Sequence, residues 1–117
     1  MKKVALFLAN GFEEIEALAT VDILRRAQIP VETVSILNEK TVTGAHNVSV
    51  IADKIFQEAD FSDIEVLVLP GGMPGAKHLN EYEALKELII KFNDEGKQIA
   101  AICIYLIRFS SFFNFRN

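Results

Sequence analysis

Short apolar runs that end at glycine-containing turns constrain the fold of this chain more than any other feature. The runs KVALFLA, residues 3–9, and IEVLVL, residues 64–69, each contain a single charged residue and lead into Asn-Gly and Pro-Gly-Gly. Such runs are typical of strands that are buried on both faces of a parallel sheet. Because helical patterns follow both runs, we predict an α/β fold: a doubly wound, mostly parallel sheet with helices on both faces.

The rest of the chain alternates between strand and helix patterns. Residues 31–37 and 97–103 are predicted strands, and a small hairpin is predicted around residues 44–47. In sheets of this kind, ligand sites form beyond the carboxyl ends of the strands. The segments that follow residues 9, 69 and 103 are therefore the candidate site loops.

Two helices are predicted, over residues 12–28 and 80–96. The first has acidic residues in its first turn and arginines in its last, which suits the helix dipole. The second is expected to begin with Asn80 as N-cap and to stop at Gly96. The apolar residues expected to face the core are Ile15, Leu18, Ala19, Val21, Ile23 and Ala27 in the first helix, and Leu85, Leu88, Ile89 and Phe92 in the second.

Length and charge exclude several classes of protein. The 117 residues fit one domain, and a net charge of −4 argues against a nucleic-acid-binding surface. One cysteine cannot form an internal disulfide or a cysteine-based zinc site. The N-terminal segment lacks the features of a signal peptide, and no apolar run is long enough for a membrane span. We therefore expect a cytoplasmic protein without membrane or nucleic-acid partners.

The single cysteine, Cys103, ends the predicted strand at residues 97–103. A sharp turn into a helix would place its sulfur where backbone N–H groups favour the thiolate. Gly71 and Gly72 could offer N–H groups as an oxyanion hole, and Glu16 could share a proton with the thiol. On the residues alone an alternative stays open: a buried structural cysteine, a turn that merely ends a strand, and a solvated glutamate.

Three motifs together resemble a known family. FLANGFEEIEA, VLVLPGGMPGAKHL and AAIC, in this order, are similar to the ThiJ/PfpI superfamily in its deglycase-like branch, which includes the Parkinson-associated protein. The resemblance covers residues 1–103 and implies a flavodoxin-like fold, a homodimer, and no cofactor or metal. The residues that it implies for the site are Cys103 as the reactive cysteine, Glu16 as its acid partner, and Gly71 and Gly72 as pocket donors. Ile104, which follows Cys103, could donate its backbone N–H to the same pocket.

The same resemblance implies a range of functions. The first is a cysteine-dependent action on small reactive carbonyls or their protein adducts, as in deglycases and glyoxalases. The alternative is a redox-sensing or chaperone-like stress protein that works through oxidation of Cys103. Other members carry labels of thiazole monophosphate (thiamine) biosynthesis or intracellular protease, so the fold alone does not choose among these functions.

The match ends abruptly after Cys103. The family continues with small residues, whereas this chain has Ile104-Tyr105 and then a segment with four phenylalanines, two arginines and no acidic residue. We interpret residues 1–103 as the N-terminal part of a ThiJ/PfpI domain and residues 104–117 as a divergent tail. A truncated or frameshifted, inactive form would have this sequence; alternatively, the tail covers the sheet. His46 and His78 are expected to be ordinary surface residues.

Overall fold

A five-stranded parallel sheet forms the centre of the molecule, and the computed structural model describes residues 2–102. The strands are β1 (Lys3–Leu8), β2 (Val31–Ser35), β5 (Lys54–Ile55), β6 (Ile64–Leu69) and β7 (Gln98–Ala101), in the spatial order β5-β2-β1-β6-β7. All four neighbouring pairs are parallel. The hairpin consists of β3 (Thr41–Thr43) and β4 (Ser49–Ile51). The helices are α1 (Glu14–Arg26), α2 (Gly75–Glu81), α3 (Glu83–Asp94) and the short 3-10 helix η1 (Phe56–Glu58).

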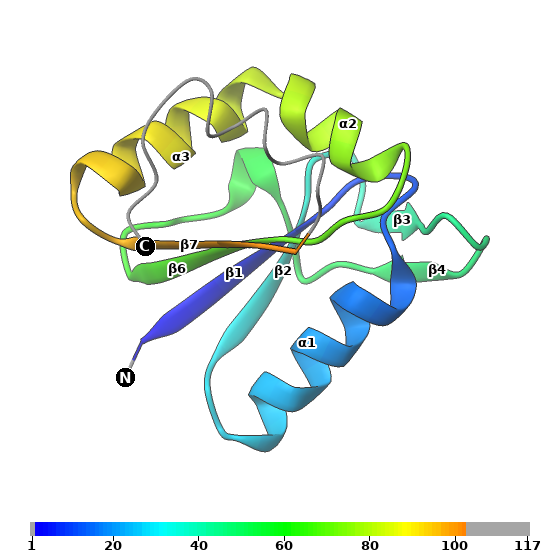
Figure 1. Ribbon diagram of the computed structural model, residues 1–117, viewed down its shortest axis with the longest axis horizontal. Helices are drawn as coiled ribbons and strands as arrows, with labels where there is room; N and C mark the ends of the chain where they lie inside the picture. Colours follow the sequence, from blue (N-terminus) through cyan, green and yellow to red (C-terminus); the bar gives the residue numbers. More distant parts are fainter. Residues whose placement is uncertain (1, 103–117) are drawn as a thin grey trace.

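Helices cover both faces of the sheet, which confirms the predicted doubly wound α/β fold. Figure 1 shows α1 on one face, and α2 and α3 on the other. The crossover from β1 to β2 runs through α1, whereas the crossover from β6 to β7 runs through α2 and α3. The strand order therefore reverses between β1 and β6, and the loops after these two strands lie next to each other at the carboxyl edge.

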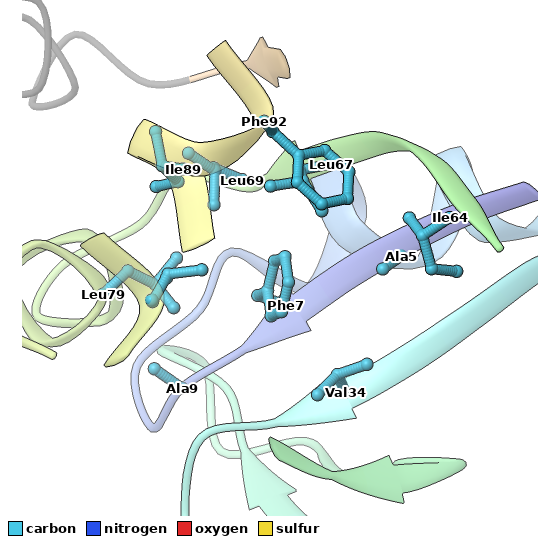
Figure 2. Close-up of a cluster of buried hydrophobic side chains, with 11 residues drawn as sticks. Ala5, Phe7, Ala9, Val34, Ile64, Leu67, Leu69, Leu79, Ile89 and Phe92 are labelled. Carbon is cyan, nitrogen blue, oxygen red and sulfur yellow. The ribbon is translucent and has the colours of Figure 1, made fainter. Parts of the chain in front are cut away.

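Strand β1 is buried on both faces, as its apolar sequence predicts. Ala5 and Phe7 belong to the core cluster under α2 and α3 (Figure 2), whereas Leu6 and Leu8 belong to the cluster under α1. Phe7 is fully buried, and its ring centroid lies 5.9 Å from that of Phe56. One short strand thus contributes to two separate cores, because its alternate side chains point to opposite faces.

The buried face of α1 differs from the predicted one. Ala17 and Val21 face the sheet, but Ile15 is 76% exposed and Ile23 is 63% exposed. Leu18, Ala19 and Ala27 are exposed as well, so Val21 is the one residue of the predicted inward set that the structure buries. The reason is that α1 has apolar residues on two of its sides, and only one side packs against the sheet.

The second predicted helix is divided at Tyr82. Its first part, α2, begins at Gly75, within a segment predicted to be a loop, and Asn80 lies inside α2 rather than at an N-cap. The backbone of Tyr82 is extended, and its ring contacts Phe56 edge-on with centroids 5.3 Å apart. In α3, Leu85, Ile89 and Phe92 are buried and Leu88 is partly buried, as predicted. Gly96 has a positive φ of 74° just after α3, which confirms the predicted stop.

An apolar groove of about 350 Å³ lies between α1 and β7, on the face of the sheet opposite to α3. Val66 and Val68 of β6 line it, together with Ala100, Ile102 and Leu24. The hypothesis that residues 104–117 cover the sheet concerns residues outside the described part of the chain. Within residues 2–102, every helix is too short or too polar to span a lipid bilayer.

Candidate functional site

The loops that follow β1 and β6 are interlocked at the carboxyl edge of the sheet. The N–H of Glu13 donates to the carbonyl oxygen of Gly71 at 2.9 Å, and the N–H of Gly75 donates to that of Gly11 at 3.1 Å. Gly72 has a φ of +101°, and a Cβ there would lie 2.4 Å from the nitrogen of Glu13. Glycine at position 72 is therefore required both by the backbone conformation and by the close approach of the other loop.

This interlock places the carboxylate of Glu16 beside the Pro-Gly-Gly turn. The N–H of Gly71 donates to Oε1 of Glu16 at 3.0 Å. The N–H of Glu16 itself donates to Oε2 of Glu13, the N-cap of α1, at 2.9 Å. The structure thus brings together three of the residues singled out in the sequence, Glu16, Gly71 and Gly72. Gly71 already donates to Glu16, whereas the N–H of Gly72 has no hydrogen-bond partner within residues 2–102.

The remaining two predicted site residues, Cys103 and Ile104, lie outside the described residues. Ile102, the residue before Cys103, lies beside the end of β6, because its N–H donates to the carbonyl oxygen of Leu69 at 3.2 Å. Leu69 is the last residue of β6 and directly precedes the Pro-Gly-Gly turn. Strand β7 therefore ends beside the turn whose second residue, Gly71, holds Glu16.

A buried carboxylate close to this site was not predicted from the sequence. Glu14 is only 6% exposed, and its Oε2 accepts the backbone N–H groups of His46 at 2.7 Å and of Val48 at 3.2 Å. Its Oε1 lies 2.9 Å from Nδ1 of His46. Gly44 leaves room for this carboxylate, because a Cβ there would lie 2.3 Å from the carboxyl carbon. His46 is exposed at the surface, as predicted, and its backbone and ring also tie the β3–β4 hairpin to α1.

The pKa shifts of Glu14 and His46 both favour the charged forms, so the two residues form an ion pair. Burial by itself would raise the pKa of Glu14, but hydrogen bonds from the His46 ring and from backbone N–H groups outweigh it and lower the pKa to about 2. The hydrogen bond to Glu14 and its negative charge raise the pKa of His46 above its ordinary value of 6.5.

The stabilisation that comes from the pKa shift of Glu14 is lost at low pH, whereas the stabilisation that comes from the shift of His46 is lost at high pH. The contribution of Glu14 is present above its ordinary pKa of 4.5 and is lost as the pH falls through its lowered pKa. The contribution of His46 is complete below pH 6.5 and is lost as the pH rises through its raised pKa. The pair therefore stabilises the fold most between pH 4.5 and 6.5.

His78 lies apart from the Glu16 site. It is exposed on α2 and lines a shallow cavity of about 290 Å³. The other lining residues are Asn10, Ile36, Leu37, Glu81 and Tyr82. Since this cavity contains neither Glu16 nor the Gly71–Gly72 pair, the structure does not bring His78 to the candidate site.

The reversal of strand order, together with a carboxylate held at the carboxyl edge, defines a flavodoxin-like α/β domain with its site at the strand ends. Comparison with known sequences identifies the family within this fold class. The profile of the DJ-1/PfpI family matches residues 2–107, and the chain belongs to this family.

Individual relatives agree with this assignment. The chain is 35% identical over 105 residues to the Parkinson disease protein 7 homolog of Danio rerio, in a match that covers 87% of this chain and 54% of the relative. It is 32% identical over 111 residues to the glutathione-independent glyoxalase DJ-1 of Schizosaccharomyces pombe, covering 88% and 58% of the two chains. Across the relatives compared, the chain spans 23% to 58% of their length.

Solved structures show the same fold. The C103A mutant of a DJ-1 superfamily protein from Salmonella typhimurium superimposes with a TM-score of 0.88 at 37% identity, over 94% of this chain and 60% of that one. Oxidized DJ-1 from Toxoplasma gondii superimposes with a TM-score of 0.86 at 35% identity, over 91% and 58% of the two chains.

Proposed function

We propose that this chain carries the cysteine-dependent site of a DJ-1/PfpI protein that acts on small reactive carbonyls or on their protein adducts. The observation that supports this most is the 3.0 Å hydrogen bond from Gly71 to Glu16, which holds a carboxyl group at the strand edge. In the sequence, Cys103 follows the end of β7 after one residue, Ile102, and β7 pairs with β6 at this same edge. The fission yeast relative is named a glutathione-independent glyoxalase.

The proposed chemistry begins with addition of the Cys103 thiolate to a carbonyl carbon. The new C–S bond forms while the carbonyl π electrons move to oxygen, which takes the proton of the Glu16 carboxyl group. We infer that Gly72 and Ile104 supply N–H groups to the developing oxyanion, whereas the predicted third donor, Gly71, holds Glu16. Gly72 is the donor that this geometry favours, since Gly71 is engaged by Glu16.

With an α-oxoaldehyde such as methylglyoxal, the adduct then rearranges without an external oxidant. One proton moves from the former aldehyde carbon to the neighbouring carbon, and the hydroxyl proton moves to the ketone oxygen, which converts the hemithioacetal into the thioester of a 2-hydroxy acid. Water hydrolyses the thioester to a 2-hydroxy acid and releases the thiol. In the overall reaction, an α-oxoaldehyde and one water molecule give a 2-hydroxy acid. The reaction therefore requires no cofactor.

Methylglyoxal consumption by the wild type, Cys103→Ala, Glu16→Gln and Glu87→Gln tests this proposal. We expect Cys103→Ala to abolish consumption and Glu16→Gln to lower kcat/KM about 100-fold or more, the usual range for a lost general acid–base. Glu87 is exposed on α3, and its variant is the matched control that keeps full activity. A Cys103→Ala protein that consumes methylglyoxal like the wild type would refute the proposal.

A redox sensor is the second candidate, and one solved relative is an oxidized DJ-1. Each of two equivalents of peroxide would transfer one oxygen atom to the Cys103 sulfur and release water, giving first the sulfenic and then the sulfinic acid. The Glu16 carboxyl would hydrogen-bond the oxidised sulfur. Peptide mass spectrometry after mild peroxide treatment should find two added oxygens on Cys103. Oxidation mainly of Met73, which is 52% exposed, would count against a sensor.

We also propose that the protein is a cytoplasmic homodimer. A single cysteine suits a reducing compartment. The large exposed side chains of Ile15 on α1 and Ile51 on β4, 76% and 77% exposed, support an apolar contact surface between copies. Sedimentation of the wild type and of Ile15→Lys tests the assembly: the wild type should sediment as a dimer and the variant as a monomer.

A further inference from the structure

Two carboxylates and an imidazole converge at the start of α1, apart from the Glu16 carboxylate. Oε1 of Glu14 lies 2.9 Å from Nδ1 of His46, and Oε1 of Glu13 lies 3.6 Å from the same nitrogen. One donor atom from each residue lies within 4.8 Å of the other two. Figure 1 shows the start of α1 beside the β3–β4 hairpin, whose turn carries His46.

The two carboxylates are oriented by hydrogen bonds through their other oxygens. Oε2 of Glu14 accepts two backbone N–H groups of the hairpin, and Oε2 of Glu13 accepts the N–H of Glu16. Both Oε1 atoms are therefore held toward the ring of His46. Outer hydrogen bonds of this kind fix the direction of carboxylate ligands in metal sites.

The distances from Nδ1 of His46 to the two carboxylate oxygens suit a single divalent ion, and all three donor atoms lie within 4.8 Å of one another. Ligands bound at about 2.0–2.2 Å from one ion lie roughly 3–3.5 Å apart in octahedral or tetrahedral geometry. The two distances from Nδ1 of His46, 2.9 and 3.6 Å, are close to this range. A metal ion could thus take the place of the Nδ1 proton between the ring and the two carboxylates.

Charge balance points to a cation independently of the spacing. Glu14 is 6% exposed, and within residues 2–102 the ring of His46 is the only positive partner of Glu13 and Glu14. Two carboxylates thus share a single side chain that can carry a positive charge. A buried charge is costly unless it is paired or coordinates a metal.

We propose that Glu13, Glu14 and His46 form a site for a divalent first-row transition metal such as Zn²⁺, with water completing the coordination. One imidazole nitrogen with carboxylate oxygens suits zinc, nickel or copper better than calcium or magnesium. The ion would tie the β3–β4 hairpin to the first turn of α1. This inference goes beyond the carbonyl chemistry proposed above and does not depend on it.

Zinc titration by calorimetry tests the site in the full-length chain. The Cys103→Ser variant is used as the background, because a thiolate near Glu16 would bind zinc as well. We expect one Zn²⁺ per chain, with affinity lowered at least tenfold by His46→Gln. The glutamine introduced by this substitution has an amide that can donate to Glu14 but lacks the ligating nitrogen. His78→Gln removes an exposed histidine elsewhere and should leave the affinity unchanged.

Nitrogen-15 NMR of the histidine side chains gives a readout that does not depend on the folding of a variant. Zinc should shift Nδ1 of His46 and leave both ring nitrogens of His78 in place. Absence of zinc binding, a shift confined to His78, or binding that His46→Gln does not weaken would each overturn the proposal.

Discussion

Gly72→Ala should destabilise the interlock of the two site loops by an amount that follows from the structure. An L residue at a φ of +101° costs about 1–2 kcal/mol. The added Cβ would lie 2.4 Å from the nitrogen of Glu13 and 2.8 Å from the carbonyl oxygen of Gly11. Because these are backbone atoms, the loops must move, which costs about 1–3 kcal/mol more. The expected loss of unfolding free energy is about 2–5 kcal/mol, a large share of a typical domain's 5–15.

Urea denaturation followed by circular dichroism measures this loss. With a slope of about 2 kcal/mol per molar urea, the midpoint should fall by roughly 1–2.5 M. Gly96→Ala is the matched control: Gly96 also has a positive φ, 74°, but it is exposed after α3. The control should therefore show the conformational cost alone, about 1–2 kcal/mol. If Gly72→Ala shifts the midpoint no more than Gly96→Ala, the reasoning about the interlock is wrong.

Two further predictions concern polar contacts of the fold. Oδ2 of Asp53 accepts the N–H and the hydroxyl of the buried Thr33 and also contacts Arg25, so Asp53→Ala should cost about 1–3 kcal/mol in urea denaturation. Arg25→Ala, which removes only the exposed partner, should cost less than about 1 kcal/mol, and equal losses would contradict this assignment. In buffer with EDTA, the stability gained from His46 relative to His46→Gln should be greatest between pH 4.5 and 6.5, where Glu14 is ionised and the ring is protonated, and should decline at higher pH. A difference that does not change with pH would show that the ion pair with Glu14 does not stabilise the fold.

Elements with one dominant local signal were predictable from the sequence. Strands β1 and β6 are apolar along almost their whole length, which is the pattern of a strand buried on both faces. The stop at Gly96 was predictable because glycine readily adopts the left-handed conformation that ends a helix. The proximity of the loop before Glu16 to the Pro-Gly-Gly turn followed from topology, since the loops after adjacent parallel strands meet at one edge.

Elements with two competing local signals were not predictable in the same way. Helix α1 has apolar residues on more than one side, and its sequence does not say whether Ala17 or Ile15 meets the sheet. Residues 75–94 include a strong helical pattern, yet the helix is interrupted at Tyr82, whose ring packs against Phe56. In both cases the packing of distant residues selected one of the alternatives.

By itself, the sequence determined the fold class, the family and the edge of the sheet at which the site lies, because hydrophobic periodicity and turn residues act locally and the motifs occur in a specific order. Only the tertiary structure decided that Glu14 is buried, that His46 contacts it across 32 positions of sequence, and that the N–H of Gly71 is taken by Glu16. The physical reason is that each of these contacts joins segments far apart in the chain. Their hydrogen bonds form only when the sheet and its hairpin bring those segments together.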